Sequence, residues 1–190
     1  MLLFQKQKSV LAEDEIEDVL TASALGCMKV DYRELSLNKE TLRFVGDIDD
    51  IYEDLCNLIS ENFGLTRNGT YMANTGTNEK PVYNAEKYPA CISKVILYEK
   101  IQGNMETYTY TSKTVPTITH PVPQKTDLIT VPTVSYTKTY DNSYKKPEII
   151  TPNGKKANTL SAYVEVIMPL KIAGREGYIK RDIYVILEDI

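Results

Sequence analysis

The chain has 190 residues, of which 42% are hydrophobic and 25% charged, so it suits one packed domain and disfavours global disorder. Its formal net charge of -4 argues against nucleic acid or an anionic membrane surface as partner, because both attract basic patches. No stretch reaches the roughly 18 to 20 apolar residues that span a bilayer, and the opening letters MLLF are too few for the apolar part of a signal peptide.

The first segment is predicted to be a helix from about Phe4 to about Met28. Apolar residues recur there at three- to five-residue steps, which is typical of a helix that turns one stripe towards a core. The stripe consists of Leu11, Ile16, Val19, Leu20, Leu25 and Met28. The acidic run between residues 13 and 18 is interpreted as the solvated opposite face, not as a metal site.

Two short stretches, KVDYRELSL and ETLRFVG, are predicted to carry extended pieces. A second helix follows from Ile48 to Phe63, with Asp47 as its N-cap and Gly64 at its C-terminal stop. Its acidic first turn suits the helix dipole better than a calcium loop. The residues expected in the core are Ile51, Leu55, Leu58 and Ile59.

The stretch from Thr66 to Ala90 is rich in turn-forming residues and is predicted to be a loop. Asn68, Gly69 and Thr70 match the acceptor pattern for N-glycosylation. Because Asn-Gly is itself a strong turn signal, a plain turn is the preferred interpretation.

The pattern then changes to a period of two, which predicts strands. CISKVILYEKI alternates Ile92, Lys94, Ile96 and Tyr98 against Val95 and Leu97, and METYTYTS follows across a hairpin turn at Gly103-Asn104. Tyr108 and Tyr110 are expected on one face, with Thr107, Thr109 and Thr111 on the other.

A second antiparallel hairpin is predicted near the end of the chain. Its strands run over about Ser161–Leu170 and Tyr178–Leu187, joined through a turn at Gly174–Gly177. Proline removes a ladder hydrogen-bond donor, so the end of the first strand that holds Pro169 is expected to be an edge or a bulge.

Between the hairpins, residues 114–152 form a proline-rich region. Six prolines favour extended or edge conformations there, namely Pro116, Pro121, Pro123, Pro132, Pro147 and Pro152. We expect an excursion with short strands of its own, such as DLITV and TVSYTKTY, because long structureless connections are rare. The resulting prediction is one α+β domain over residues 1–190, with two helices on an antiparallel sheet.

Chemistry-bearing residues are few. The cysteines Cys27, Cys56 and Cys91 are odd in number and form no CxxC pair, so neither a closed disulfide framework nor a zinc site is expected. Cys27 and Cys56 fall on the inner faces of the predicted helices and are interpreted as buried free thiols, with a bridge as the alternative.

Neither nucleophilic nor phosphate-binding chemistry is indicated. The single histidine, His120, lies in the proline-rich region without a catalytic partner in its neighbourhood, and Asn153-Gly154-Lys155-Lys156 is interpreted as a turn. We therefore assign no catalytic, cofactor-binding or metal-binding residue and expect a protein that is not an enzyme. An unrecognised hydrolase remains an alternative.

The order of these pieces resembles pilin-like proteins of clostridial-type bacteria, related to the TadE-like minor pilins of Tad-type pilus systems. The resemblance rests on three stretches and covers most of the chain outside the proline-rich region. They are Leu20-Thr21-Ala22-Ser23-Ala24-Leu25 followed by Asp31-Tyr32, then Thr151-Pro152-Asn153-Gly154, and finally Pro169-Leu170-Lys171. The membrane segment that precedes the first stretch in the family is missing here.

This resemblance implies a pilin-like fold and an extracellular, membrane-anchored structural protein at the cell surface. It would act through contacts with other pilus or secretion-system subunits, without a small-molecule substrate. We further expect the first helix to have continued upstream into the membrane anchor, which would explain its uncapped start. The alternative is a free-standing secreted binding module that recognises a partner through its Tyr/Thr-rich hairpin and the proline-rich region.

Overall fold

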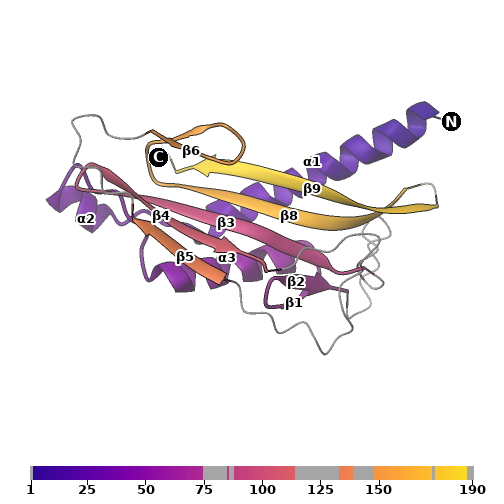
Figure 1. The fold of residues 1–190 in the computed structure, drawn as a ribbon, viewed down its shortest axis with the longest axis horizontal. Helices are drawn as coiled ribbons and strands as arrows, with labels where there is room; N and C mark the ends of the chain where they lie inside the picture. The colour runs from indigo at the N-terminus through magenta and orange to yellow at the C-terminus, as the bar shows by residue number, and fades with distance from the viewer. Residues whose placement is uncertain are drawn as a thin grey trace.

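The computed structural model describes residues 2–74, 85, 88–113, 133–138, 148–172 and 174–187. It is an α+β fold in which two helices cover one face of a seven-stranded antiparallel sheet and a small β-hairpin lies on the other (Figure 1). The helices are α1(Leu2–Cys27), α2(Tyr32–Leu37) and α3(Ile48–Asn62). The strands are β1(Thr66–Asn68), β2(Tyr71–Ala73), β3(Ala90–Ile101), β4(Asn104–Thr111), β5(Thr133–Lys138), β6(Ile149–Ile150), β7(Lys156–Ala157), β8(Ser161–Ile172) and β9(Arg175–Ile186).

The sheet is built around β3, which has β4 and then β5 on one side and β8 and then β9 on the other. The first part of the predicted loop at Thr66–Ala90 is instead the short β1–β2 hairpin, which the pairing of the strands stabilises. This hairpin pairs with the first residues of β3, where Tyr71 lies opposite Cys91. We call the face that α1 and α3 cover the inner face, and the face that carries the β6–β7 hairpin the outer face.

Helix α1 confirms the first predicted helix but corrects its buried stripe. The buried side chains of the stripe are Ala12, Ile16, Leu20, Ala24 and Met28. All of these except Ala12 belong to the core between the inner face and the helices. Leu11 and Leu25 were expected in the stripe, but 66% and 52% of their surface is exposed. Both lie about half a helical turn away from the line through Ile16 and Leu20, so they point to solvent.

Helix α3 confirms the second predicted helix. Asp47 caps it by accepting a hydrogen bond from Asp49 N at 2.9 Å, and Gly64 takes the left-handed conformation that ends it. Ile51, Leu55 and Ile59 are buried as expected, whereas Leu58 is only half-buried.

The short helix α2 was missed, because an extended piece was predicted at its position. The Asp31 carboxylate accepts hydrogen bonds from the backbone of Arg33 and Glu34, which stabilises the first turn of this helix. The extended pieces on either side are confirmed, since Val30 bridges to Phe44 and Leu42 bridges to Lys100.

The β3–β4 hairpin has the predicted faces but a turn displaced by one residue. Ile101 pairs with Asn104, so Gln102 and Gly103 form the turn, with φ values of +50° and +76°. Two positive φ values define the type I′ turn that suits a two-residue hairpin. Tyr108 and Tyr110 both lie on the inner face, and both are buried.

Strand β3 does not keep one alternation along its whole length, which corrects the expected face of Ile92. Ile92 packs in the same inner core as Val95 and Leu97, while Ile96 and Tyr98 lie on the outer face. The direct pairing of β3 with β8 ends at Ile92 opposite Val166. An extra residue in β3 near Ser93, as in a β-bulge, accounts for the change of face.

The β8–β9 hairpin is confirmed and is longer than predicted. The predicted turn at Gly174–Gly177 is too long, because Ile172 pairs with Arg175 and Gly177 pairs with Leu170. The ladder continues without interruption to Ser161 opposite Ile186. Pro169 pairs with Tyr178 and lies past the first residue of β3, so this end of β8 is an edge, as expected from its missing donor.

Part of the proline-rich region returns to the sheet. Strand β5 falls within the predicted TVSYTKTY segment and pairs antiparallel with β4, with Thr133 opposite Thr111. Strand β6 pairs with β7 through Ile149 and Ala157. The predicted DLITV strand and five of the six prolines lie outside the described residues; Pro152 is exposed.

Candidate functional site

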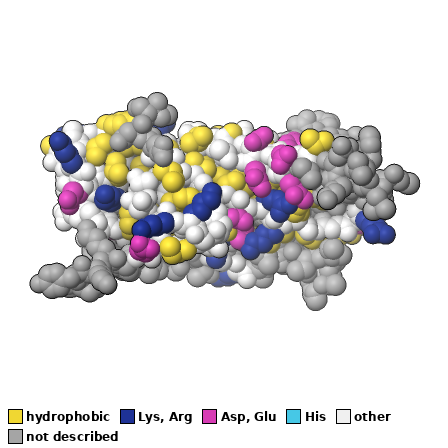
Figure 2. Space-filling view, turned by 90° about the horizontal axis from the view of Figure 1, so that it is seen from above, with side chains coloured by type: hydrophobic (Ala, Val, Ile, Leu, Met, Phe, Trp, Pro, Cys, Tyr) yellow, Lys and Arg dark blue, Asp and Glu magenta, His cyan; other side chains and the backbone are white. Residues whose placement is uncertain are grey.

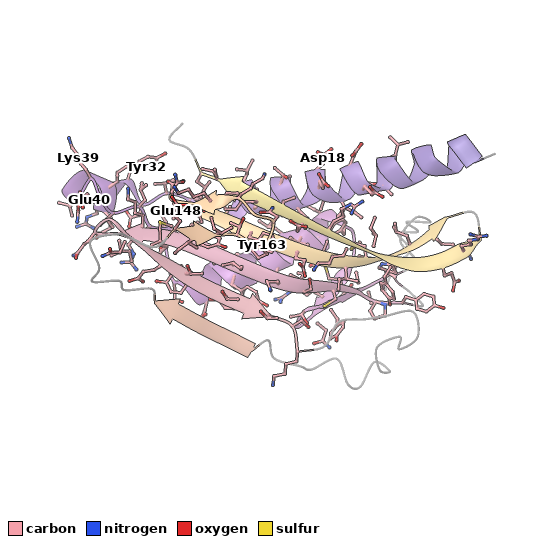
Figure 3. The ribbon with its side chains drawn as sticks, turned by 45° about the horizontal axis from the view of Figure 1, so that its top comes forward. Asp18, Tyr32, Lys39, Glu40, Glu148 and Tyr163 are labelled. Carbon is pink, nitrogen blue, oxygen red and sulfur yellow. The ribbon has the colours of Figure 1, made fainter. Side chains whose placement is uncertain are left out.

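The surface features that are candidates for function lie on the helices and on the outer face of the sheet. Helix α1 forms a stem of 26 residues, and its buried apolar side chains among those described run from Ala12 to Ala24. Figures 1 and 3 show that its N-terminal end diverges from the β8–β9 hairpin. Asp18 projects from the stem away from the sheet (Figure 3).

The two long helices carry an acidic surface, as expected for the run in α1. Residues 11–28 and 47–65 contain acidic residues but neither lysine nor arginine. Except for the half-buried Glu13, all of these carboxylates are exposed: Asp14, Glu15, Glu17, Asp18, Asp47, Asp49, Asp50, Glu53, Asp54 and Glu61. Arg181 reaches α1 from β9 to pair with Glu13 and Glu17, and Arg67 pairs with Glu53. Seen from above, acidic side chains gather on one part of the surface (Figure 2), and the acidic run of α1 lies near the middle of this helix.

The outer face of the sheet carries a small apolar cluster and lysines, in contrast to the acidic surface of the helices. A small cluster of Ile96, Tyr98, Ala157 and Tyr163 is buried under the β6–β7 hairpin, where Tyr98 meets Tyr184 edge to face with their ring centroids 6.2 Å apart. Around this cluster, strand alternation and pairing bring lysines to the outer face. These are Lys94, Lys100, Lys156, Lys171 and Lys180. Lys155 joins them from the turn before β7, with its Nζ 6.0 Å from the ring centroid of Tyr184.

One carboxylate is buried on the outer face with a complete set of donors. Glu165 accepts hydrogen bonds from Ser93 Oγ at 2.6 Å and Tyr163 OH at 3.1 Å, and its Oε2 lies 2.6 Å from Lys180 Nζ. Burial by itself raises the pKa of Glu165. The donated hydrogen bonds from Lys180, Ser93 and Tyr163 outweigh burial and hold the pKa below its usual 4.5.

A second buried carboxylate lies on the inner face beside another carboxylate. Glu99 and Glu106 are directly opposite in the β3–β4 ladder, and Tyr108 OH lies 3.3 Å from Glu99 and 2.6 Å from Glu106. Phe44 N donates to Glu99 at 3.0 Å, and Arg43 Nε lies 3.6 Å away. Burial raises the pKa of Glu99 above 4.5 despite these partners.

Sequence reasoning did not identify either carboxylate cluster. A usable signal exists, because Glu99 in VILYEKI and Glu165 in AYVEVIM are single carboxylates within strongly apolar strands. A single carboxylate within an apolar strand tends to be buried when that strand lies inside the sheet. A buried carboxylate requires hydrogen-bond partners. Both clusters hold structure together: Glu99 fastens residues 43–44 to β3, and Glu165 joins β3, β8 and β9.

The three cysteines are all at least half-buried in the fold. Cys27 is half-buried and Cys56 is buried, in agreement with their predicted inner positions, and none of the three cysteines forms a disulfide. Burial raises the pKa values of Cys27 and Cys56 to about 11 and about 12, so both are protonated near neutral pH. Cys27 lines a depression of about 370 Å³ between α1 and α3, with Asp54, Asn57 and Glu61 among its other walls.

The remaining sequence motifs form turns or lie outside the described residues. Asn68-Gly69-Thr70 is the turn between β1 and β2, with Gly69 at φ +61°, and the Thr70 hydroxyl is buried within 2.9 Å of Ser112 Oγ. Asn153-Gly154 is also a turn, as predicted, with Gly154 at φ +80°. His120 lies outside the described residues.

Among the described residues, Cys, His, Asp and Glu side chains form no group of three that would hold a metal ion. None of the described helices has both the length and the apolarity that crossing a membrane requires. No protein-family model, curated protein or solved structure matched the chain.

Proposed function

We propose that this chain is a pilin-like structural subunit of a cell-surface assembly, resembling a membrane-anchored minor pilin or pseudopilin. In this proposal α1 is a stem that links the domain to a membrane or to neighbouring subunits, and the domain acts through protein–protein contacts. The observation that carries the proposal is the arrangement of α1, which has one stripe packed on an antiparallel sheet and an N-terminal end that diverges from it.

The composition of α1 supports the same role. Its exposed side alternates carboxylates with Leu11 and Leu25, so it offers charge and apolar area together. Exposed apolar side chains within a polar surrounding are typical of surfaces that meet another protein.

The alternative, a secreted binding module that uses the tyrosines of the β3–β4 hairpin, has less support. Tyr98, Tyr108 and Tyr110 have at most 9% of their surface exposed. Tyrosines contribute to recognition through accessible ring area, and these rings fill the interior of the domain.

The proposal is tested by a substitution that disrupts the N-terminal part of α1 and leaves its buried stripe unchanged. Ser9→Pro introduces a proline inside α1, before Ala12, where it removes a helical hydrogen bond and costs about 3 kcal/mol of local helix stability. We expect the purified variant to keep the melting temperature of the domain. When it is produced in its native cells, and surface complexes are cross-linked and then sheared from the cells, we expect the variant to be absent from those complexes. Ser9→Ala is the matched control and should remain in them.

Two outcomes would contradict the proposal. One is recovery of the unaltered protein as a monomer in the medium, which is the behaviour of the secreted binding module. The other is an unchanged yield of Ser9→Pro in surface complexes. If α1 links the domain to a membrane or to neighbouring subunits, a kink at this position should disturb that link.

A further inference from the structure

We propose that copies of this chain stack on one another, with the acidic helix surface of one copy docking on the lysine-rich outer face of the next. This inference rests on the proposed role as an assembly subunit and names its partner as a second copy. Three observations carry it: the separation of charge between the two sides of the sheet, the exposed apolar side chains on each side, and the opposite directions in which the two surfaces face.

The separation of charge is large for a chain of net charge -4. The acidic surface of α1 and α3 is opposed by Arg181 and Arg67, which come from β9 and β1, and by Lys29, which lies in the depression between the two helices. On the outer face, Lys156, Lys171 and Lys180 pair with Glu148, Glu176 and Glu165. Lys94, Lys100 and Lys155 add positive charge there, against Asp182. The helix surface therefore repels a second helix surface and attracts the outer face.

Each of the two surfaces also presents large apolar side chains. On α1, Leu11, Asp18 and Leu25 are spaced by seven residues and lie along one line on the side away from the sheet. On the opposite side of the molecule, Ile150 of β6 is 54% exposed and Ile186 of β9 is 37% exposed. Apolar contact surrounded by complementary charge is the usual composition of a specific interface.

Because the two surfaces differ and face opposite ways, the contact is heterologous. A heterologous contact leaves one free surface of each kind at the ends of a pair, so it continues into a ring or an open filament. Two like surfaces pairing about a two-fold axis would bring acidic helices together, which like-charge repulsion opposes.

The test uses one charge reversal on each surface and one elsewhere. Asp18→Lys alters the helix surface and Lys155→Glu alters the outer face; both residues are exposed, so the fold is expected to tolerate the changes. Glu40→Lys, at the far end of the molecule beyond α2 (Figure 3), is the control that matches the charge change of Asp18→Lys.

Self-association of the full chain is measured by sedimentation velocity over a range of concentrations, in low salt and at about 0.15 M salt, where charges are screened beyond about 8 Å. We expect the unaltered chain and Glu40→Lys to associate, more strongly in low salt. Asp18→Lys and Lys155→Glu should each associate about tenfold more weakly. An equimolar mixture of these two variants should regain association, because the new amine at position 18 of one variant then meets the new carboxylate at position 155 of the other.

The inference is overturned if the unaltered chain stays monomeric in low salt, if Asp18→Lys associates as well as the unaltered chain, or if the mixture associates no better than its components. Any of these results leaves the proposed function standing when Ser9→Pro is still lost from surface complexes. Failure of both experiments would remove the assembly role itself.

Discussion

On the inner face of the sheet Glu99 is buried beside a second carboxylate, whereas on the outer face Glu165 is buried beside an amine. Both side chains have less than a tenth of their surface exposed. Burial raises the pKa of Glu99, and Glu106, directly opposite, raises it further. Arg43 lowers this pKa but does not offset burial, because it is half exposed and 3.6 Å away. The donors around Glu165 reverse the effect of burial and lower its pKa. The partners of a buried carboxylate therefore decide the direction of its pKa shift.

The same contrast extends to the two faces as a whole. The inner face owes its stability to apolar packing of the sheet against α1 and α3. The outer face has a small apolar cluster and a network of hydroxyl, carboxylate and amine groups. The inner face should consequently respond most to loss of apolar volume, and the outer face to loss of charge.

The largest effect is expected from removing the helix that covers the inner face. Deleting residues 1–20 removes Ile16 and Leu20, both fully buried, and uncovers the core beneath them. We expect the shortened chain to lack a cooperative thermal transition. Deleting residues 1–7 is the control and should leave the melting temperature nearly unchanged, since it keeps the buried stripe of Ala12, Ile16, Leu20 and Ala24 in place. If both deletions are equally damaging, the start of α1 is an integral part of the domain.

Within the inner core, Leu55→Ala is the next largest change. Leu55 is fully buried in α3 against the sheet, so its truncation should cost about 2 to 5 kcal/mol of the free energy of unfolding, measured by urea denaturation. Leu58→Ala on the same helix is the matched control and should cost less, because Leu58 is half-buried. A loss below about half a kcal/mol for Leu55→Ala would show that the face is not tightly packed.

The two glutamates should give opposite dependences of stability on pH. Because the folded pKa of Glu165 is lowered, its contribution is present above 4.5 and is lost as pH falls through the folded value. The folded pKa of Glu99 is raised, so its contribution is present below 4.5 and is lost as pH rises through the folded value. Glu165→Gln should therefore cost about 1 to 3 kcal/mol near neutral pH and less in acid.

Glu99→Gln is the matched variant on the inner face. Relative to the unaltered chain, its free energy of unfolding should improve as pH rises from about 4 to about 7, because the amide carries no charge to desolvate. Urea denaturation across this range distinguishes the two sites. Parallel profiles for Glu99→Gln and Glu165→Gln would contradict the contrast between the two faces.

Much of this fold follows from local pattern, and the errors have identifiable physical causes. The periodicity and caps of Ile48–Asn62 are local properties, and so are the alternation and turn glycine of the β8–β9 hairpin; both elements were predicted with bounds close to those observed. Exposure of Leu11 and Leu25 was missed because apolar spacing alone does not fix which side of α1 the sheet covers.

Long-range features escaped prediction for a related reason. The change of face in β3 depends on how β8 pairs with it, and the partners of Glu165 come from positions 93, 163 and 180, which only the fold brings together. Helix α2 is six residues long, too short for a periodic pattern, and depends on the Asp31 cap. The pilin-like role remains a prediction that the proposed experiments test.

The smallest expected effect concerns the turn that places Glu106 opposite Glu99. In a hairpin the turn fixes the register, and a shift of one residue would move every side chain of β4 to the other face. Gln102 occupies the first turn position with φ +50°, a conformation that asparagine adopts more easily than glutamine. Gln102→Asn should therefore raise the free energy of unfolding by up to about 1 kcal/mol without changing the register.

Asn104→Ala, at the first paired position of β4, is the control and should give no such gain. A gain from a change at position 104 and none at position 102 would place the turn at Gly103-Asn104. The register would then differ and Glu106 would leave the inner face, so that burial of Glu99 itself would be left as the cause that raises its pKa.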